Sequence, residues 1–218
     1  PYSLAVLEQV AKTFSSENCP EFMAQEVATT WQEYVDYQDI RVLEIGMDLA
    51  YFDHLKCLAK DLDHPLLKSL VTLTIDCYNV ITVERALSLK KPNSFMKQLL
   101  SDAGTFSARE VIQCVEQGNL ISWFQQVNPL PYDVELTQYE EQMRAGRVTA
   151  ETVEYLEHVL KYRILEQASF EIDGPLPLAL YLFGKDLEVK NLRLVLTGLD
   201  NQLPIDKIKE RMRPIYGQ

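Results

Sequence analysis

Residues 48–87 read DLAYFDHLKCLAKDLDHPLLKSLVTLTIDCYNVITVERAL and hold the two strongest helical patterns of the chain. Pro65 divides the stretch and suits the first position of a new helix. The stretch therefore predicts two consecutive long helices, over residues 48–63 and 65–89. In the first of them, apolar side chains recur at three- and four-residue spacing and so share one stripe: Leu49, Phe52, Leu55, Leu58, Ala59 and Leu62.

The second helix is apolar around almost its whole circumference, so other helices must pack around it. Its exceptions form a thin polar line of Asp76, Asn79 and Arg85. A buried charge without a partner is costly, and candidate partners are present within the same helix or its repeat. We therefore interpret the line as an intramolecular polar cluster that ties helices together, with an interaction site as the alternative.

A fainter copy of this helix pair is found near the C-terminus, over residues 150–197. The residues AYFDH at 50–54 are matched by VEYLEH at 153–158, in the first helix of each pair. The second helix of the copy is predicted to begin at Pro175 and to stop at Gly198, since glycine commonly ends a helix. The matched residues and the helix that follows them together indicate a repeated plan of an amphipathic helix followed by a long apolar one.

The polar line of the first pair also has a counterpart. Glu188 and Asn191 repeat the spacing of Asp76 and Asn79, and Arg193 follows, although at a different offset from Arg85. An acid and an asparagine three residues apart share one face of a helix. A second intramolecular polar cluster of Glu188, Asn191 and Arg193 is therefore predicted.

Helical patterns fill most of the remaining sequence. Only residues 39–46 have a composition typical of a β-strand. They are too isolated to form a sheet, so we expect an irregular connector or an early helical turn. The prolines within residues 128–131 form the strongest internal break. The predicted fold class is all-α, made of repeated helical-bundle lobes with long buried helices.

The length of 218 residues allows one large domain or two small ones. We place one lobe at residues 1–130, with its central helix pair at 48–89. The second lobe is placed at residues 131–218, with its helix pair at 150–197 and a C-terminal helix. The boundary is soft, and one continuous domain is the alternative.

The composition is that of an ordinary globular protein, with 47% hydrophobic and 24% charged residues. A net charge of −11 argues against nucleic acid as a partner. The charge is uneven, however, because residues 185–218 are basic. The C-terminal basic residues either complement a helix dipole or form a possible interface: Lys207, Lys209, Arg211 and Arg213.

No motif for catalysis or cofactor binding is visible in the sequence. His54, His64 and His158 share no metal-ligand spacing with a second histidine or a cysteine, and we interpret them as surface or cap residues. The glycines form no phosphate-binding loop, and no serine or cysteine lies in a nucleophile elbow. We therefore expect no catalytic residue, no metal and no cofactor. The longest uncharged apolar run, residues 175–184, is also too short to span a bilayer.

Four stretches resemble the family of C subunits of archaeal and bacterial A/V-type ATPases, whose counterpart in the vacuolar enzyme is called the d subunit. The resemblance covers most of the chain in order and rests on helix patterns rather than on a catalytic signature. The stretches are MDLAYFDHLKCLAK (47–60), IDCYNVITVERA (75–86), GPLPLALYLFGKDLEVKNLRLVLTG (174–198) and IDKIKERMRPIY (205–216).

The resemblance implies a funnel-like, all-helical protein of three similar lobes, two of which are present here, so that the N-terminal lobe is missing. It implies a non-catalytic connector that couples the central shaft, made of the D and F subunits, to the membrane rotor ring of proteolipid subunits. Such a connector serves ATP-driven proton or sodium transport and lies on the cytoplasmic side as a peripheral part of a membrane complex. No nucleic acid and no transmembrane segment of its own are expected.

Two departures from the family pattern are visible. Residues 199–201 lack the lysine that usually follows the threonine and glycine, which puts one basic contact in doubt, and Asp186 replaces a usual glutamate. The alternative function is an all-helical adaptor or regulatory protein-interaction domain unrelated to rotary ATPases. An all-α hydrolase is a third reading, but no residue pattern supports it.

Overall fold

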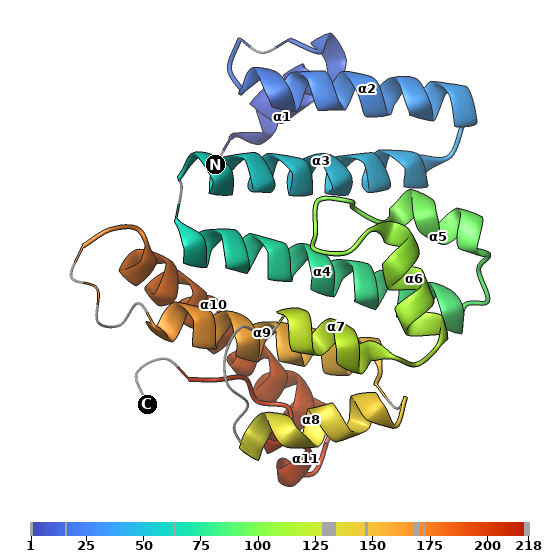
Figure 1. Cartoon of the computed structure of the whole chain (residues 1–218). Coiled ribbons are helices and arrows are strands. Elements are labelled where there is room, and N and C mark those ends of the chain that lie inside the picture. Colours follow the sequence, from blue (N-terminus) through green and yellow to red (C-terminus); the bar gives the residue numbers. More distant parts are fainter. Residues whose placement is uncertain are drawn as a thin grey trace. The chain divides into compact units, whose positions relative to one another are not determined.

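The chain is built of α-helices, and no strand is found within the residues that the structure describes (Figure 1). The computed structural model describes residues 2–15, 17–62, 64–127, 134–146, 148–167, 171 and 173–215. The all-α prediction is confirmed. The helices are α1 (Leu4–Thr13), α2 (Glu21–Tyr37), α3 (Ile40–Asp61), α4 (Pro65–Ser88), α5 (Asn93–Leu99), α6 (Ala108–Glu116), α7 (Leu120–Val127), α8 (Val134–Arg144), α9 (Ala150–Glu166), α10 (Leu176–Asp200) and α11 (Ile205–Lys209).

The helices form two compact units, residues 1–57 and residues 58–218. The first unit holds α1, α2 and most of α3, and the second holds the end of α3 and all later helices. The lobe boundary expected near residue 131 falls on residues 128–133, which lie outside the described residues. The division into lobes 1–130 and 131–218 stays a prediction.

In the first unit, α3 begins at Ile40 rather than near Asp48, so residues 40–46 are fully helical and not a connector. The side chain of Asp39 explains the early start, because its Oδ1 accepts a hydrogen bond from the N–H of Arg41 at 3.0 Å and satisfies a free donor of the first turn. Hydrogen bonds from the side chain and backbone of Arg41 lower the pKa of Asp39 to about 2. The β-branched residues in this segment have a lower helix propensity, so the sequence pattern did not indicate a helix there.

In the second unit, α4 is the central helix, and it begins at Pro65 as predicted and ends at Ser88, one residue before the predicted end. It packs along α9 and also contacts α5 and α6. By length and composition alone α4 could cross a membrane, but a helix buried in a protein core can have the same length and composition. Nine of its residues are buried, Asp76 and Asn79 among them, so α4 is a core helix of the second unit.

The long helix α10 runs to Asp200, so the prediction that it stops at Gly198 is wrong. Gly198 is buried inside the helix, where α11 approaches closely. A Cβ added there would lie 2.7 Å from the Cδ1 of Ile208 on α11. The stop is made by Gln202, which takes the left-handed conformation (φ 55°), and by the N–H of Leu203, which donates to the carbonyl of Gly198 at 2.8 Å.

The same helix end is found on α4. Lys90 is left-handed (φ 54°), and the N–H of Lys91 donates to the carbonyl of Ala86 at 2.9 Å. The short helix that follows starts after Pro92 in one case and after Pro204 in the other. These positions on α4 and α5 correspond to those on α10 and α11 at a constant offset of 112 residues. The second helix of each pair suggested by the sequence is therefore repeated, together with the short helix that follows it, down to the backbone turns between them.

An earlier part of the chain is repeated as well. Ser3 caps α1 by accepting from the N–H of Val6, and Ser107 caps α6 by accepting from the N–H of Glu110. The residues that end these helices, Phe14 and Gly118, both have positive φ, at 52° and 64°. Ser107 also forms a capping box, in which its own N–H donates to the side chain of Glu110 at 2.8 Å.

Replacing Gly198 by alanine tests the close approach of α11. We expect Gly198→Ala to lower the free energy of unfolding by about 1–2 kcal/mol, because overpacking against Ile208 outweighs the gain in helix propensity. In an Ile208→Ala background, which removes both contacting atoms, Cδ1 at 2.7 Å and Cγ1 at 2.8 Å, the loss should be smaller. Urea unfolding measures both, with exposed Thr197→Ala as the matched control. Equal losses in the two backgrounds would contradict the close approach.

Candidate functional site

Asn79 holds the chain segment after α5 against α4. Its side chain is fully buried, and its Nδ2 donates to the carbonyl of Ser101 at 2.8 Å. The N–H of Ser101 in turn donates to Oδ1 at 3.0 Å. The amide thus satisfies the N–H and the carbonyl of a buried residue, as the backbone of a neighbouring strand does in a β-sheet.

Asn191 on α10 makes the same pair of hydrogen bonds. Its Nδ2 donates to the carbonyl of Arg213 at 3.0 Å, and the N–H of Arg213 donates to its Oδ1 at 2.9 Å. In both cases the partner lies 22 residues further along the chain. We call these two arrangements the amide clamps. They connect each long apolar helix to the segment that follows its short companion helix.

The remaining residues of the predicted clusters divide between several places. Asp76 lies beside the first clamp, where its Oδ1 accepts from the N–H of Thr105 at 2.8 Å. Arg85 instead forms an ion pair with Glu154 of α9. Asp76 and Asn79 are thus brought together on one loop, residues 101–105, and Arg85 is not.

In the second predicted cluster, Glu188 is half-buried and pairs with Lys185 at 2.8 Å. The side chain of Arg193 is exposed. Only Asn191 of the three therefore holds the C-terminal segment. Arg193 does not occupy the position equivalent to Arg85, which is Thr197 at the 112-residue offset, and this explains why the arginines behave differently.

His158 of α9 links this second clamp to the core, a role that the sequence did not reveal. Arg213 donates from its Nε to Nδ1 of the ring at 3.2 Å, and the Nζ of Lys190 lies 2.9 Å from Nε2. Burial lowers the pKa of His158 to about 4, and the charges of Lys190, Arg213 and Lys161 act in the same direction, while Asp186 opposes them. Contrary to the prediction of a surface or cap residue, His158 is therefore a neutral ring between two cations.

The four C-terminal basic residues differ in their surroundings. Lys207 pairs with Glu210 at 2.9 Å. Lys209 and Arg211 are exposed. Arg213 is half-buried and is held by Asn191 and His158. An interface role thus suits Lys209 and Arg211 best, whereas Arg213 is part of the fold.

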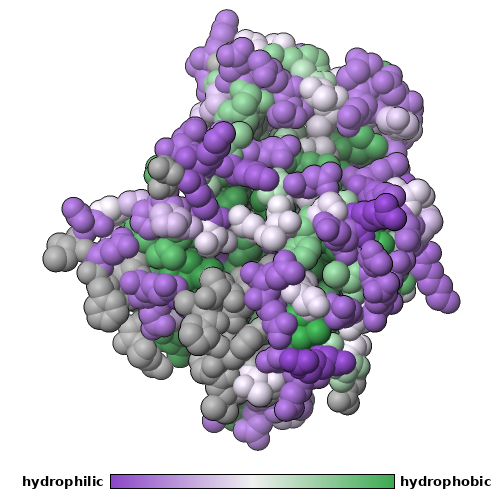
Figure 2. All heavy atoms as spheres, viewed as in Figure 1, coloured by the Kyte–Doolittle hydropathy of each residue, from purple (hydrophilic) through white to green (hydrophobic). Residues whose placement is uncertain are grey.

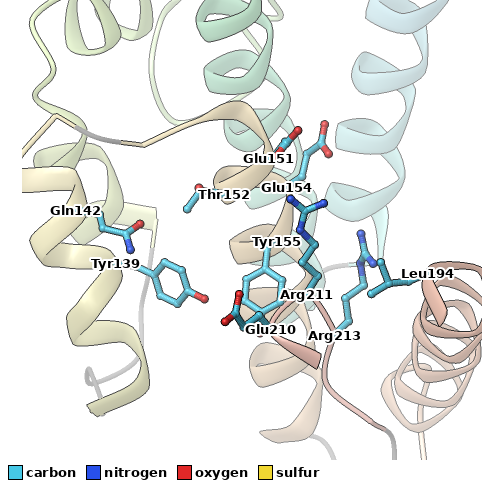
Figure 3. A pocket seen from close by; sticks show the side chains of 10 residues that line it. All are labelled: Tyr139, Gln142, Glu151, Thr152, Glu154, Tyr155, Leu194, Glu210, Arg211 and Arg213. Carbon is cyan, nitrogen blue, oxygen red and sulfur yellow. The ribbon is translucent and has the colours of Figure 1, made fainter. Parts of the chain in front are cut away.

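A polar pocket of about 520 Å³ opens between α8, α9, α10 and the C-terminal segment (Figure 3). Arg211 and Arg213 line it together with the acids Glu151, Glu154 and Glu210, so its charges nearly balance. In the close-up, the guanidinium of Arg211 points toward the side on which Glu151 and Glu154 lie. The described residues contain no group of three histidine, cysteine or acidic side chains that could hold a metal ion.

Removing a clamp amide tests its structural role. We expect Asn79→Ala to lower the free energy of unfolding by about 2–4 kcal/mol, because it leaves the N–H and carbonyl of Ser101 unpaired in the core. Asn191→Ala should cost less, about 1–3 kcal/mol, because its site is more open. Asn201→Ala is the control, because it removes only an exposed hydrogen bond from a side-chain amide to the carbonyl of Thr197. Similar midpoints in urea for all three variants would refute the role.

The lowered pKa of His158 predicts a pH dependence of stability. The unfolded chain binds a proton on this ring near pH 6.5 and the folded chain only near pH 4, so the contribution of His158 is present above pH 6.5 and is lost as the pH falls toward 4. His158→Gln should therefore lose less stability than the parent chain between pH 7.5 and pH 5. Urea midpoints at the two pH values measure the difference. Parallel losses would show that the ring does not titrate in this range.

Comparison with known proteins identifies the family to which the chain is similar. The family model described as ATP synthase (C/AC39) subunit matches residues 2–211. The C subunit of the V-type sodium ATPase of Enterococcus hirae is 26% identical over 217 residues, which are 99% of this chain and 64% of that protein. The chain thus spans less than two thirds of the length of this relative. No solved structure matches the chain. With nearly all of its residues inside the family match, the chain belongs to the ATP synthase (C/AC39) subunit family.

Proposed function

We propose that the protein is a non-catalytic connector in a rotary V/A-type ATPase. In this role it couples the central shaft, made of the D and F subunits, to the membrane rotor ring of proteolipid subunits for ATP-driven proton or sodium transport. It lies on the cytoplasmic side of the membrane as a peripheral part of the complex. The observation that carries the proposal is the family match over residues 2–211. The same match argues against an adaptor unrelated to rotary ATPases.

The packing of the second unit supports a mechanical role. A part that passes torque between two partners needs stiff, closely packed elements and a broad surface rather than a reaction site. Helices α4, α9 and α10 supply two long apolar interfaces, and the amide clamps fix the segments that follow α5 and α11. The exposed cations Lys209 and Arg211 supply charge on a surface that is otherwise acidic overall.

Removal of the protein from the complex tests the proposal. We expect proteoliposomes that hold the complex without this protein to lose ATP-driven ion uptake while ATP hydrolysis by the soluble part continues, because rotation is no longer passed to the ring. Adding the purified protein should restore uptake. Ion uptake and phosphate release are measured on the same vesicles. Uptake that is unchanged in its absence would falsify the connector role.

The C-terminal cations refine the same experiment. The double variant Lys209→Ala/Arg211→Ala should weaken binding of the protein to the rest of the complex about 3–10-fold at low salt, and the difference should narrow at high salt. Lys12→Ala/Lys60→Ala removes the same charge from exposed positions on other helices and is the control. Equal weakening by both variants would point to net charge rather than to a contact at α11.

A further inference from the structure

The imidazole of His158 lies between two cationic side chains that need the same kind of partner. Arg213 donates from its Nε to Nδ1 of the ring at 3.2 Å, and the Nζ of Lys190 lies 2.9 Å from Nε2. Guanidinium and ammonium groups donate hydrogen bonds and accept none. A neutral imidazole carries one N–H and one bare nitrogen, so it accepts at one nitrogen only. His158 therefore accepts from Arg213 or from Lys190, but not from both at once.

Each cation keeps another partner when it gives up the ring. Lys190 forms an ion pair with Asp186 at 2.7 Å, one turn earlier on α10. The backbone of Arg213 stays in the second amide clamp, because its N–H and its carbonyl are both bonded to the side chain of Asn191. The loss of either contact therefore leaves neither side chain without support, and both tautomers of the ring are accessible in the folded chain.

The two tautomers place the guanidinium of Arg213 differently. With the ring proton on Nε2, Nδ1 accepts from Arg213 and holds its side chain against α9. With the proton on Nδ1, the ring N–H faces the guanidinium, and Nε2 accepts from Lys190 instead. Two donors cannot form a hydrogen bond with each other, so Arg213 turns away from the ring. The pocket of about 520 Å³ that Arg213 already lines then offers acidic partners to the guanidinium (Figure 3): Glu151, Glu154 and Glu210.

The segment that carries Arg213 has room to move. Residues 211–215 follow α11, and three side chains hold them through polar contacts: Asn191, His158 and Tyr162, whose hydroxyl donates to the carbonyl of Ile215 at 3.3 Å. A second pocket, of about 400 Å³, is also lined by this segment: Met212, Arg213, Pro214 and Ile215. Hydrophilic residues cover much of the region of Figure 2 where Figure 1 draws α8 and α11. A small shift of the segment therefore replaces polar contacts by water and breaks little apolar packing.

The equivalent segment of the first repeat is fixed in another way. At the offset of 112 residues, Ser101 takes the place of Arg213. Its hydroxyl is part of a buried residue and accepts from the backbone N–H two residues further along. Tyr78 takes the place of Lys190, and its hydroxyl donates to a backbone carbonyl at 3.3 Å. These contacts join neutral groups and do not compete for one acceptor. The competition at His158 is therefore not required by the repeated backbone.

We propose that His158 is a latch for the C-terminal segment, residues 211–215, which holds Arg213 in one tautomer and releases it in the other tautomer and on protonation. A protonated ring has an N–H at both nitrogens and accepts from neither cation. The charged groups that act on the ring come from its own helix, from α10 and from the segment: Lys161, Lys190, Asp186 and Arg213. Three of these four are cations, so a charge on the ring repels the segment. The inference rests on α9, α10 and the C-terminal segment and does not require the proposed connector role.

Replacing Lys190 by glutamine tests the competition at the ring. The new amide oxygen can accept from Nε2–H, so Lys190→Gln should fix the tautomer whose Nδ1 holds Arg213. Long-range ¹H–¹⁵N NMR spectra report the tautomer, and we expect an average of both in the parent and the Nε2–H form in the variant. Hydrogen exchange of the Arg213 amide at pH 7 should be at least threefold slower in the variant. Lys185→Gln removes the same charge from an exposed position on the same helix and should change neither readout.

Acid tests the latch independently of Lys190. Because burial lowers the pKa of His158 to about 4, the ring takes up its proton between pH 7 and pH 4. Over this range, the protection of the Arg213 amide against exchange should fall at least threefold relative to that of the Ser101 amide. The Ser101 amide is the internal control, because it donates to Asn79 in the first clamp. His158→Asn places an amide oxygen near the position of Nδ1 and takes up no proton, so the relative fall should disappear in this variant.

Three results would overturn the proposal. The first is one and the same tautomer in the parent chain and in Lys190→Gln. The second is exchange of the Arg213 amide that Lys190→Gln does not slow. The third is a fall in protection with acid that persists in His158→Asn, which would place the titrating group elsewhere. Lys190 is half-buried, so its variant should keep the fold and supply a result even if His158→Asn is unstable. None of these readouts depends on ion pumping, so they are independent of the connector test.

Discussion

The rest of the structure depends on one interaction, the pair of hydrogen bonds between an asparagine side chain and a distant backbone residue. Apolar packing supplies most of the stabilisation of a helical core, but it is non-directional and tolerates small shifts along a helix. The amide of Asn79 can satisfy the N–H and carbonyl of Ser101 in one register only, and an unpaired group in its place would cost about 1–3 kcal/mol. Asn191 fixes Arg213 in the same way. Burial holds the helices together, and the amide clamps decide where the following segments lie.

Local periodicity explains why so much of this plan could be predicted from the sequence. The helix pairs follow from apolar spacing and from proline, and the equal spacing of Asp76 to Asn79 and of Glu188 to Asn191 is a property of one helix face. The partners of these side chains could not be predicted, because Ser101 and Arg213 contribute backbone groups, which any residue has. The grouping of Arg85 and Arg193 with the clamps failed for a related reason. Each follows its asparagine in sequence but lies at a different turn of its helix.

The remaining differences come from contacts between elements that are distant in sequence. Gly198 resembles a helix stop, yet it serves the approach of Ile208 from the next helix. His158 stands on an ordinary amphipathic helix, and only the return of the chain at Arg213 places a cation at its second nitrogen. Neither contact leaves a mark in the spacing of neighbouring residues. A signal was present in the match of 50–54 with 153–158, but it indicated a repeat and not the environment of the histidine.

The two repeats are alike in the contacts that each makes within itself, and they differ on the face that α4 turns toward α9. Helices α4 and α10 keep the same end turns and the same clamp, which are the devices that hold a repeat together. The polar residues that α4 turns toward α9 are replaced on α10 by Leu196 and Thr197. Under an equivalent backbone, such a difference is not required by the turns and clamps that hold each repeat together.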